Sequence, residues 1–268
     1  SQSLSKENTA VEFCRLSSED GQYSSYAFPR RKDLLSTFGK INGLLVFVEF
    51  LDIKGSDDPI SESRKFTENF TNFWADNSYG KLEINFEVYP KYIEIKKQST
   101  DYGMQKWGTG NAGPYFADVL NAASKYYDLS KFDFFVVLPP RDISTIAYGP
   151  AFPDFRGGDF GSPTSKQKFF GTVGGADQRN KETSWIWLAH EIGHNFGLGH
   201  QFNYSPAPIW DLMDNVYINV APELLGYHRF LLGWLENSQI FCIDWQDKGA
   251  INFVVPFAPI SKQKKGIK

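Results

Sequence analysis

Residues 190–200 read HEIGHNFGLGH, and this stretch uses three of the four histidines of the 268-residue chain. His190 and His194 are four residues apart, so on a helix both project from the same face and can bind one metal ion. Glu191 lies beside the first of them, where its carboxylate can reach a water at the metal without occupying the metal itself. The spacing therefore predicts a metal-binding helix with a general base next to a ligand.

The second half of the stretch supplies a turn and a third ligand. Gly197 can adopt a positive φ, which ends the helix and brings the chain back so that His200 meets the other two histidines. Three imidazoles favour zinc and leave the fourth tetrahedral position to water, as in catalytic sites. A shorter H-E-x-x-H pattern arises by chance in ordinary helices, but the added glycine and histidine favour a zinc site.

The composition is that of a globular protein, with 41% hydrophobic residues and a net charge of −3. A slightly negative net charge gives no indication of a basic surface that would bind nucleic acid or an anionic membrane. No apolar run exceeds five residues, the length of the runs at 44–48 and 134–138, which is too short to span a bilayer.

The two cysteines, Cys14 and Cys242, lie near opposite ends of the chain and away from the histidines. We interpret them as a disulfide, which implies an oxidising compartment and a secreted protein; two buried free thiols are the alternative. The sequons at Asn69 and Asn203 would permit glycosylation in a eukaryotic host. No signal peptide follows Ser1, so we expect a mature or trimmed chain.

Hydrophobic periodicity predicts an α+β fold, a mixed sheet with helices packed on it. The expected strands are 41–50, 81–89, 132–138 and a short one within 169–176, in an otherwise irregular segment 139–182. The expected helices are 61–77, capped by Ser61, then 114–128, and 183–198, capped by Thr183 or Ser184. A last helix over 222–235 precedes a hairpin of strands 239–245 and 250–257. His228 in that helix is better read as a core or partly exposed histidine than as a fourth ligand.

A second motif follows the histidines. Residues 210–214 read WDLMD, and Met213 lies thirteen residues beyond His200. Together with the zinc motif, this segment resembles the Met-turn of the metzincin clan of zinc metallopeptidases, in which a methionine lies beneath the zinc. Without the upstream motif, a loop methionine packed in a core would be the default interpretation.

Four further segments are similar to secreted peptidases of the immune-inhibitor-A type and, more distantly, to gametolysin; they span residues 43–52, 73–82, 132–140 and 231–243. The resemblance implies a metzincin-like catalytic domain over 1–238, with an N-terminal lobe to about residue 200 and an irregular C-terminal lobe over 201–238. Residues 239–268 would begin a β-rich extension that continues beyond this chain.

Two positions depart from patterns within the clan. Some metzincins carry a tyrosine ligand two residues after the Met-turn methionine, where this chain has Asn215, and Tyr217 is out of register. Gln201 follows the third histidine in place of the acidic residue of the astacins and adamalysins, which argues against those families.

The resemblance implies a secreted zinc-dependent endopeptidase, with His190, His194 and His200 as ligands and Glu191 as general base. Tyr217 and Tyr227 are the candidate oxyanion donors. We expect a protein or peptide substrate extended along an edge strand near residues 169–176. The apolar segment 202–210 would form one cleft wall and favour hydrophobic side chains.

Calcium at Asp57 and Asp58, or at Asp154 and Asp159, is conceivable, but a solvated acidic surface is the better interpretation. Three alternatives to an active endopeptidase remain open. They are a metzincin-fold binding or surface module, a latent protease blocked by a segment outside this chain, and an enzyme that hydrolyses a non-peptide amide. Glu191 argues against the first, because a binding protein needs no general base beside its metal.

Overall fold

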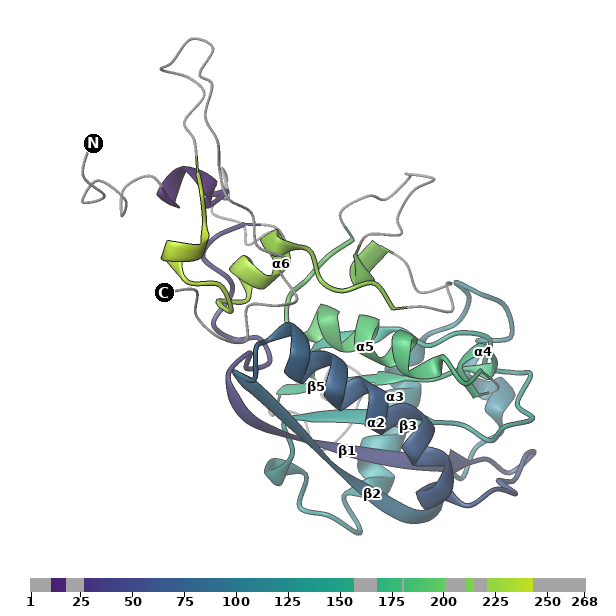
Figure 1. The fold of residues 1–268 in the computed structure, drawn as a ribbon. Coiled ribbons are helices and arrows are strands. Elements are labelled where there is room, and N and C mark those ends of the chain that lie inside the picture. Colours follow the sequence, from purple (N-terminus) through teal and green to yellow (C-terminus); the bar gives the residue numbers. More distant parts are fainter. Residues whose placement is uncertain are drawn as a thin grey trace, which may run out of the picture.

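A five-stranded mixed sheet forms the body of the molecule (Figure 1). The computed structural model describes residues 11–17, 27–156, 168–179, 181–200, 211–214 and 221–242. The strand order is β2-β1-β3-β5-β4, which confirms the predicted α+β class with its twisted mixed sheet. The strands are β1 (Gly39–Glu49), β2 (Leu82–Glu94), β3 (Phe134–Leu138), β4 (Ala151–Arg156) and β5 (Lys168–Val173).

The sheet is buried on both faces. Along β1, Ile41, Leu45 and Phe47 belong to one core cluster, while Leu44 and Val46 belong to the other. Side chains alternate between the two faces of a strand, so a strand covered on both sides reads as an unbroken apolar run. The pairs β1–β2, β1–β3 and β3–β5 are parallel, and only β4 runs antiparallel, against β5, among the described strands.

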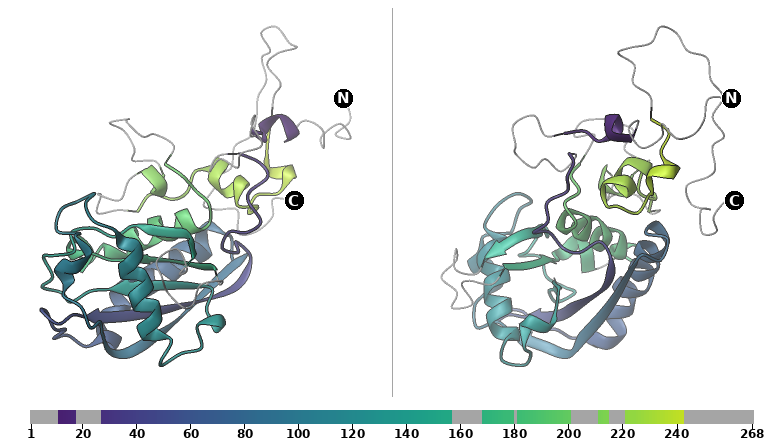
Figure 2. Two further views of the ribbon diagram at one scale, coloured as in Figure 1. Left: turned by 180° about the vertical axis from the view of Figure 1, so that it is seen from behind. Right: turned by 90° about the vertical axis from the view of Figure 1, so that its left-hand side faces the viewer.

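Helices cover the two faces unequally (Figure 2). The long helices α2 (Pro59–Asn77) and α5 (Ser184–Asn195) pack together on one face, and α3 (Ala112–Ala123) covers the other. The short helices are α4 (Ala176–Arg179), directly before α5, and α6 (Gly226–Leu231). Turns of 3-10 helix complete the list: η2 (Val11–Cys14), η3 (Ser99–Tyr102), η4 (Leu129–Lys131), η6 (Leu212–Asp214) and η7 (Asn237–Gln239).

Several predicted boundaries were wrong for identifiable reasons. The α2 helix begins at Pro59 because Asp58, not Ser61, is its cap: the Asp58 carboxylate accepts from the Ser61 backbone N–H at 2.7 Å. In the same way Asn111 caps α3, which ends at Ala123 and not near residue 128. The last helix, expected over 222–235, spans only Gly226–Leu231.

The expected edge strand was also misplaced. The strand predicted within 169–176 exists as β5, but β5 lies between β3 and β4 and is therefore an inner strand. The edge on this side of the sheet is β4, within a segment that was predicted to be irregular. Alternation in β4 is weak because its side chains are mostly half-buried or exposed, so its sequence gives little signal.

Beyond the C-terminal end of α5 lie η2, α6 and η7, which form a smaller group of elements (Figure 1). The predicted disulfide is present and joins Cys14, at the end of η2, to Cys242. Residues 239–242 contain no strand, and most of the expected hairpin lies outside the described residues, so the boundary at residue 238 stays a prediction. Within the described ranges, no helix combines the length and apolar character needed to cross a membrane.

One polar side chain joins α5 to the sheet. Asn195 is fully buried, and its amide oxygen accepts from the Gly171 N–H of β5 at 3.0 Å. Its amide nitrogen donates to the Gly171 carbonyl at 3.1 Å and to the Glu191 carbonyl at 2.8 Å. Gly171 itself lies close against β3, because a β-carbon there would lie 2.3 Å from the Phe135 carbonyl oxygen.

We predict that Asn195→Ala lowers the free energy of unfolding by about 2–4 kcal/mol, because two backbone groups of Gly171 lose their buried partner. Urea unfolding would measure the change. The control is Asn72→Ala on the exposed face of α2, which should stay within about 0.5 kcal/mol of the parent protein. Equal losses in the two variants would contradict the proposed anchoring.

Candidate functional site

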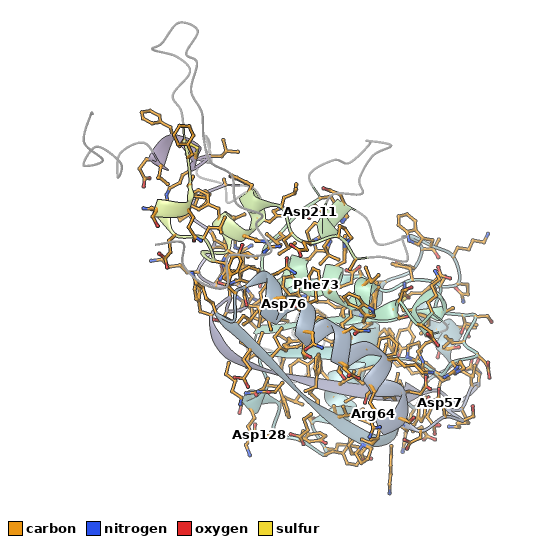
Figure 3. All side chains as sticks on the ribbon, viewed as in Figure 1. Asp57, Arg64, Phe73, Asp76, Asp128 and Asp211 are labelled. Atoms are coloured by element: carbon orange, nitrogen blue, oxygen red, sulfur yellow. A yellow bond between two sulfur atoms is a disulfide. The ribbon has the colours of Figure 1, made fainter. Side chains whose placement is uncertain are left out.

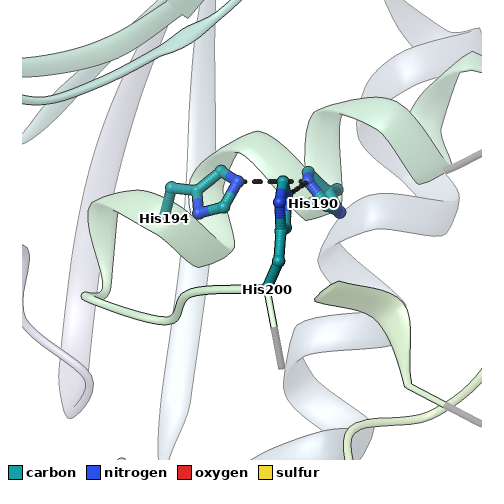
Figure 4. Close-up of side chains that lie close together, drawn as sticks. All are labelled: His190, His194 and His200. Atoms are coloured by element: carbon teal, nitrogen blue, oxygen red, sulfur yellow. Dashed lines mark hydrogen bonds between the residues drawn. The ribbon is translucent and has the colours of Figure 1, made fainter. Parts of the chain in front are cut away.

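Three imidazoles converge at the C-terminal half of α5 (Figure 4). Nε2 of His190 lies 3.1 Å from Nε2 of His194 and 2.9 Å from Nε2 of His200. His190 and His194 come from one face of α5, and His200 comes from the turn that follows it. In the described part of the chain, this is the one cluster of histidine, cysteine or acidic side chains with ligand atoms close enough to hold a metal ion.

The turn that brings His200 back is a glycine-terminated helix end. Gly197 has φ +91°, and its N–H donates to the His194 carbonyl at 2.9 Å. The next N–H, of Leu198, donates to the Gly193 carbonyl at 3.0 Å. These two bonds form a Schellman motif, which only a residue tolerant of positive φ can close without strain. The role predicted for Gly197 in the turn is thus confirmed.

Backbone carbonyls orient two of the rings. Nδ1 of His190 donates to the Leu212 carbonyl at 2.9 Å, and Nδ1 of His194 donates to the Leu198 carbonyl at 2.7 Å. A carbonyl only accepts, so each Nδ1 carries the proton and each Nε2 presents a lone pair. Sequence analysis could not find these partners, because any residue offers the same carbonyl.

The resulting arrangement fits a cation. The Nε2 lone pairs of His190 and His194 face each other across 3.1 Å, which is repulsive unless a positive charge lies between them. Burial lowers the pKa of His190 to about 3 and that of His194 to about 4, with the neighbouring imidazoles adding to the effect. Both rings are therefore neutral near pH 7, the state in which imidazole binds zinc.

Glu191 lies next to the cluster and lines the same cleft. Burial raises the pKa of its carboxyl to about 8, and a hydrogen bond from the Ala151 backbone N–H opposes that rise. A cation held by the imidazoles would lower this pKa again, because a nearby positive charge favours the carboxylate.

Met213 is fully buried and packs against α5 beside the histidines. A β-carbon on Gly193 would lie 2.4 Å from Sδ of Met213, so the absence of a side chain at Gly193 makes room for the methionine. Met213 thus lies against the turn of α5 between the first two histidines.

The cleft has a volume of about 900 Å³. Edge strand β4 contributes Ala151 and Pro153 to the lining, and the neighbouring aromatic rings of Trp107 and Tyr148 also line the cleft. Trp107 is 76% exposed, unusual for so large an apolar ring. The expected wall over 202–210 lies outside the described residues, as do Asn203, Tyr217, Gln201 and Asn215.

The structure also bears on the expectations for His228 and Tyr227. His228 is buried against Asp211, which agrees with a core histidine and not with a fourth ligand. Tyr227 packs edge-on against Phe28 and is absent from the described lining of the cleft, so it is poorly placed as an oxyanion donor.

The suggestion of calcium finds no support. Asp57 forms an ion pair with Arg179 at 2.7 Å, and Asp58 is occupied as the cap of α2 (Figure 3). Asp154 pairs with Lys168 at 3.2 Å, while Asp159 lies outside the described residues. Carboxylates already neutralised by cationic side chains make poor calcium ligands.

A cluster of three histidines, buried at His190 and exposed at His200, on a helix and its following turn above a mixed sheet has the features of a zinc metallopeptidase site. Residues 69–201 of the chain match the family model described as Metallo-peptidase family M12B Reprolysin-like. This match supports a zinc metallopeptidase family. A search of curated proteins found no match.

We predict that the metal-free protein loses stability as the pH falls from about 6.5 toward 4. In the unfolded chain both histidines take up protons near pH 6.5, whereas His190 and His194 resist protonation in the folded state. The unfolded state then binds two more protons at these histidines, which outweighs the one extra proton that the folded state holds on Glu191, so acid favours unfolding. Urea midpoints across this range should show a shallower dependence for His190→Asn; identical slopes would contradict the prediction.

We also predict that Gly193→Ala destabilises the protein by about 1–3 kcal/mol through its clash with Met213. In a Met213→Ala background the same change should cost less than half as much, since the sulfur is gone. A double-mutant cycle of unfolding free energies measures the coupling. Strict additivity would show that the methionine does not lie against Gly193.

Proposed function

We propose that this protein is a secreted zinc endopeptidase that cleaves protein or peptide chains. The observation that carries the proposal is the set of imidazole nitrogens of His190, His194 and His200, which converge beside the carboxylate of Glu191. Zinc bound there would acidify the attacking water and polarise the scissile carbonyl. The finer resemblance, to immune-inhibitor-A-type peptidases and gametolysin, rests on the sequence segments alone.

Glu191 would act as the general base and then as the general acid. Its carboxylate takes the proton of the attacking water and later delivers that proton to the leaving amine. His190 and His194 contribute through neutral Nε2 atoms, held in orientation by the Leu212 and Leu198 carbonyls. Met213 shapes the floor of the site and takes part in no proton transfer.

The substrate would lie along β4 in an extended conformation. Among the described residues this strand pairs with β5 alone, so its other edge is the one along which a peptide would pair. The Ala151 N–H of this strand already bonds to Glu191, which brings the free edge and the catalytic carboxylate together. Secretion fits the Cys14–Cys242 disulfide, because such bonds persist in oxidising compartments.

The decisive experiment measures zinc content and casein cleavage in the parent protein and in Glu191→Gln. We expect one zinc per chain in both, with kcat/KM lower in the variant by about 10²–10⁴-fold, the usual contribution of a general base. His194→Ala serves as the control that should lose the zinc itself. Zinc without cleavage in the parent protein would favour a latent protease or a binding module, and a parent protein without zinc would refute the proposal.

A further inference from the structure

Asp211 and His228 form a buried pair of ionisable side chains outside the histidine cluster. Asp211 is 1% exposed and His228 is 0% exposed. Nδ1 of His228 donates to Oδ2 of Asp211 at 2.8 Å. Asp211 lies across α5 from the sheet, directly before η6, and His228 lies in α6 (Figure 3). Burying both groups is costly unless their hydrogen bonds are satisfied, so the arrangement of those bonds is informative.

The Asp211 carboxylate holds two separate segments together. Oδ2 also accepts from the Leu225 N–H at 2.7 Å, at the start of α6. Oδ1 accepts from the Met213 N–H at 2.7 Å, within η6. Three donors on one buried carboxylate fix its position and, through it, the path of the chain around Met213.

The Met213 N–H belongs to the same peptide unit as the Leu212 carbonyl. That carbonyl accepts from Nδ1 of His190 at 2.9 Å. A peptide unit is planar, with its N–H and C=O pointing in opposite directions, so a bond that fixes the N–H also fixes the direction of the carbonyl. A continuous path of hydrogen bonds therefore runs from His228 through Asp211 and this peptide to His190.

We propose that Asp211 and His228 are positioning residues for the zinc ligand His190. Their bonds aim the Leu212 carbonyl, which in turn sets the ring orientation and tautomer of His190 and keeps its Nε2 directed at the metal. Partners of ligating imidazoles contribute to metal affinity, commonly by about 10–100-fold. The inference rests on the proposed zinc site, and it assigns a role to the one histidine outside the zinc motif.

The test compares zinc affinity and ligand geometry in His228→Leu and His228→Asn. The leucine variant removes the donor to Asp211, whereas the asparagine amide can place an N–H near the position of Nδ1. We expect His228→Leu to weaken zinc binding by about 10–100-fold in a competition assay with a chelator. We also expect it to alter the visible spectrum of the cobalt-substituted protein, and His228→Asn to restore both properties.

Phe230→Ala provides the matched control. Phe230 lies in α6 two residues after His228, is also buried, and its ring packs against Phe28, away from Asp211. Its loss should destabilise α6 without changing zinc affinity or the cobalt spectrum, provided binding is measured well below each melting temperature. If His228→Leu does not fold, His228→Gln takes its place, because its longer amide lies away from the Nδ1 position.

The outcomes distinguish failure of the positioning role from failure of the proposed zinc site. Equal zinc affinity in the parent protein and His228→Leu would overturn the positioning role while leaving the zinc site intact. Equal losses in His228→Leu and Phe230→Ala would also overturn it, since α6 would then act only as a structural support. A parent protein that binds no zinc would instead refute the site itself.

Discussion

The site depends on helix α5, which must bury one face and present metal ligands on the other. One face must bury against the sheet, and the other must hold two neutral imidazoles open to a cleft. Asn195 meets both requirements. Its amide bonds to the N–H and the carbonyl of Gly171, and these two bonds fix the rotation of α5 about its axis and its distance from the sheet. The apolar contacts of Leu188 and Ile192 give the burial energy but little directional control, which hydrogen bonds supply.

Backbone groups support the ligands around this helix. The Schellman turn at Gly197 returns the chain toward the first two histidines, and the Leu198 carbonyl within it orients His194. The Leu212 carbonyl does the same for His190 from a segment well separated in sequence. Each ring therefore has its tautomer fixed before any metal binds, which reduces the reorganisation needed on binding.

The smaller group of elements contributes to the same site from outside the sheet. Asp211 connects the segment beside the histidines to α6, and the Cys14–Cys242 disulfide joins η2 to the segment after η7. In this arrangement the third and fourth histidines of the sequence have different surroundings. His200 faces the cleft, whereas His228 lies in the core and bonds to a carboxylate.

Local sequence determined the elements whose signal is periodic or stereochemical: the buried strands β1 and β3, the helix α5, the turn at Gly197 and the meeting of the three histidines. A residue's neighbours along the chain impose those features directly. Tertiary structure alone decided that β4 and not β5 is the edge, that Asp57 pairs with Arg179, and that Asn195 and Asp211 meet distant backbone groups. Such contacts join residues far apart in sequence, and a carbonyl partner carries no residue identity, so no local pattern can specify them.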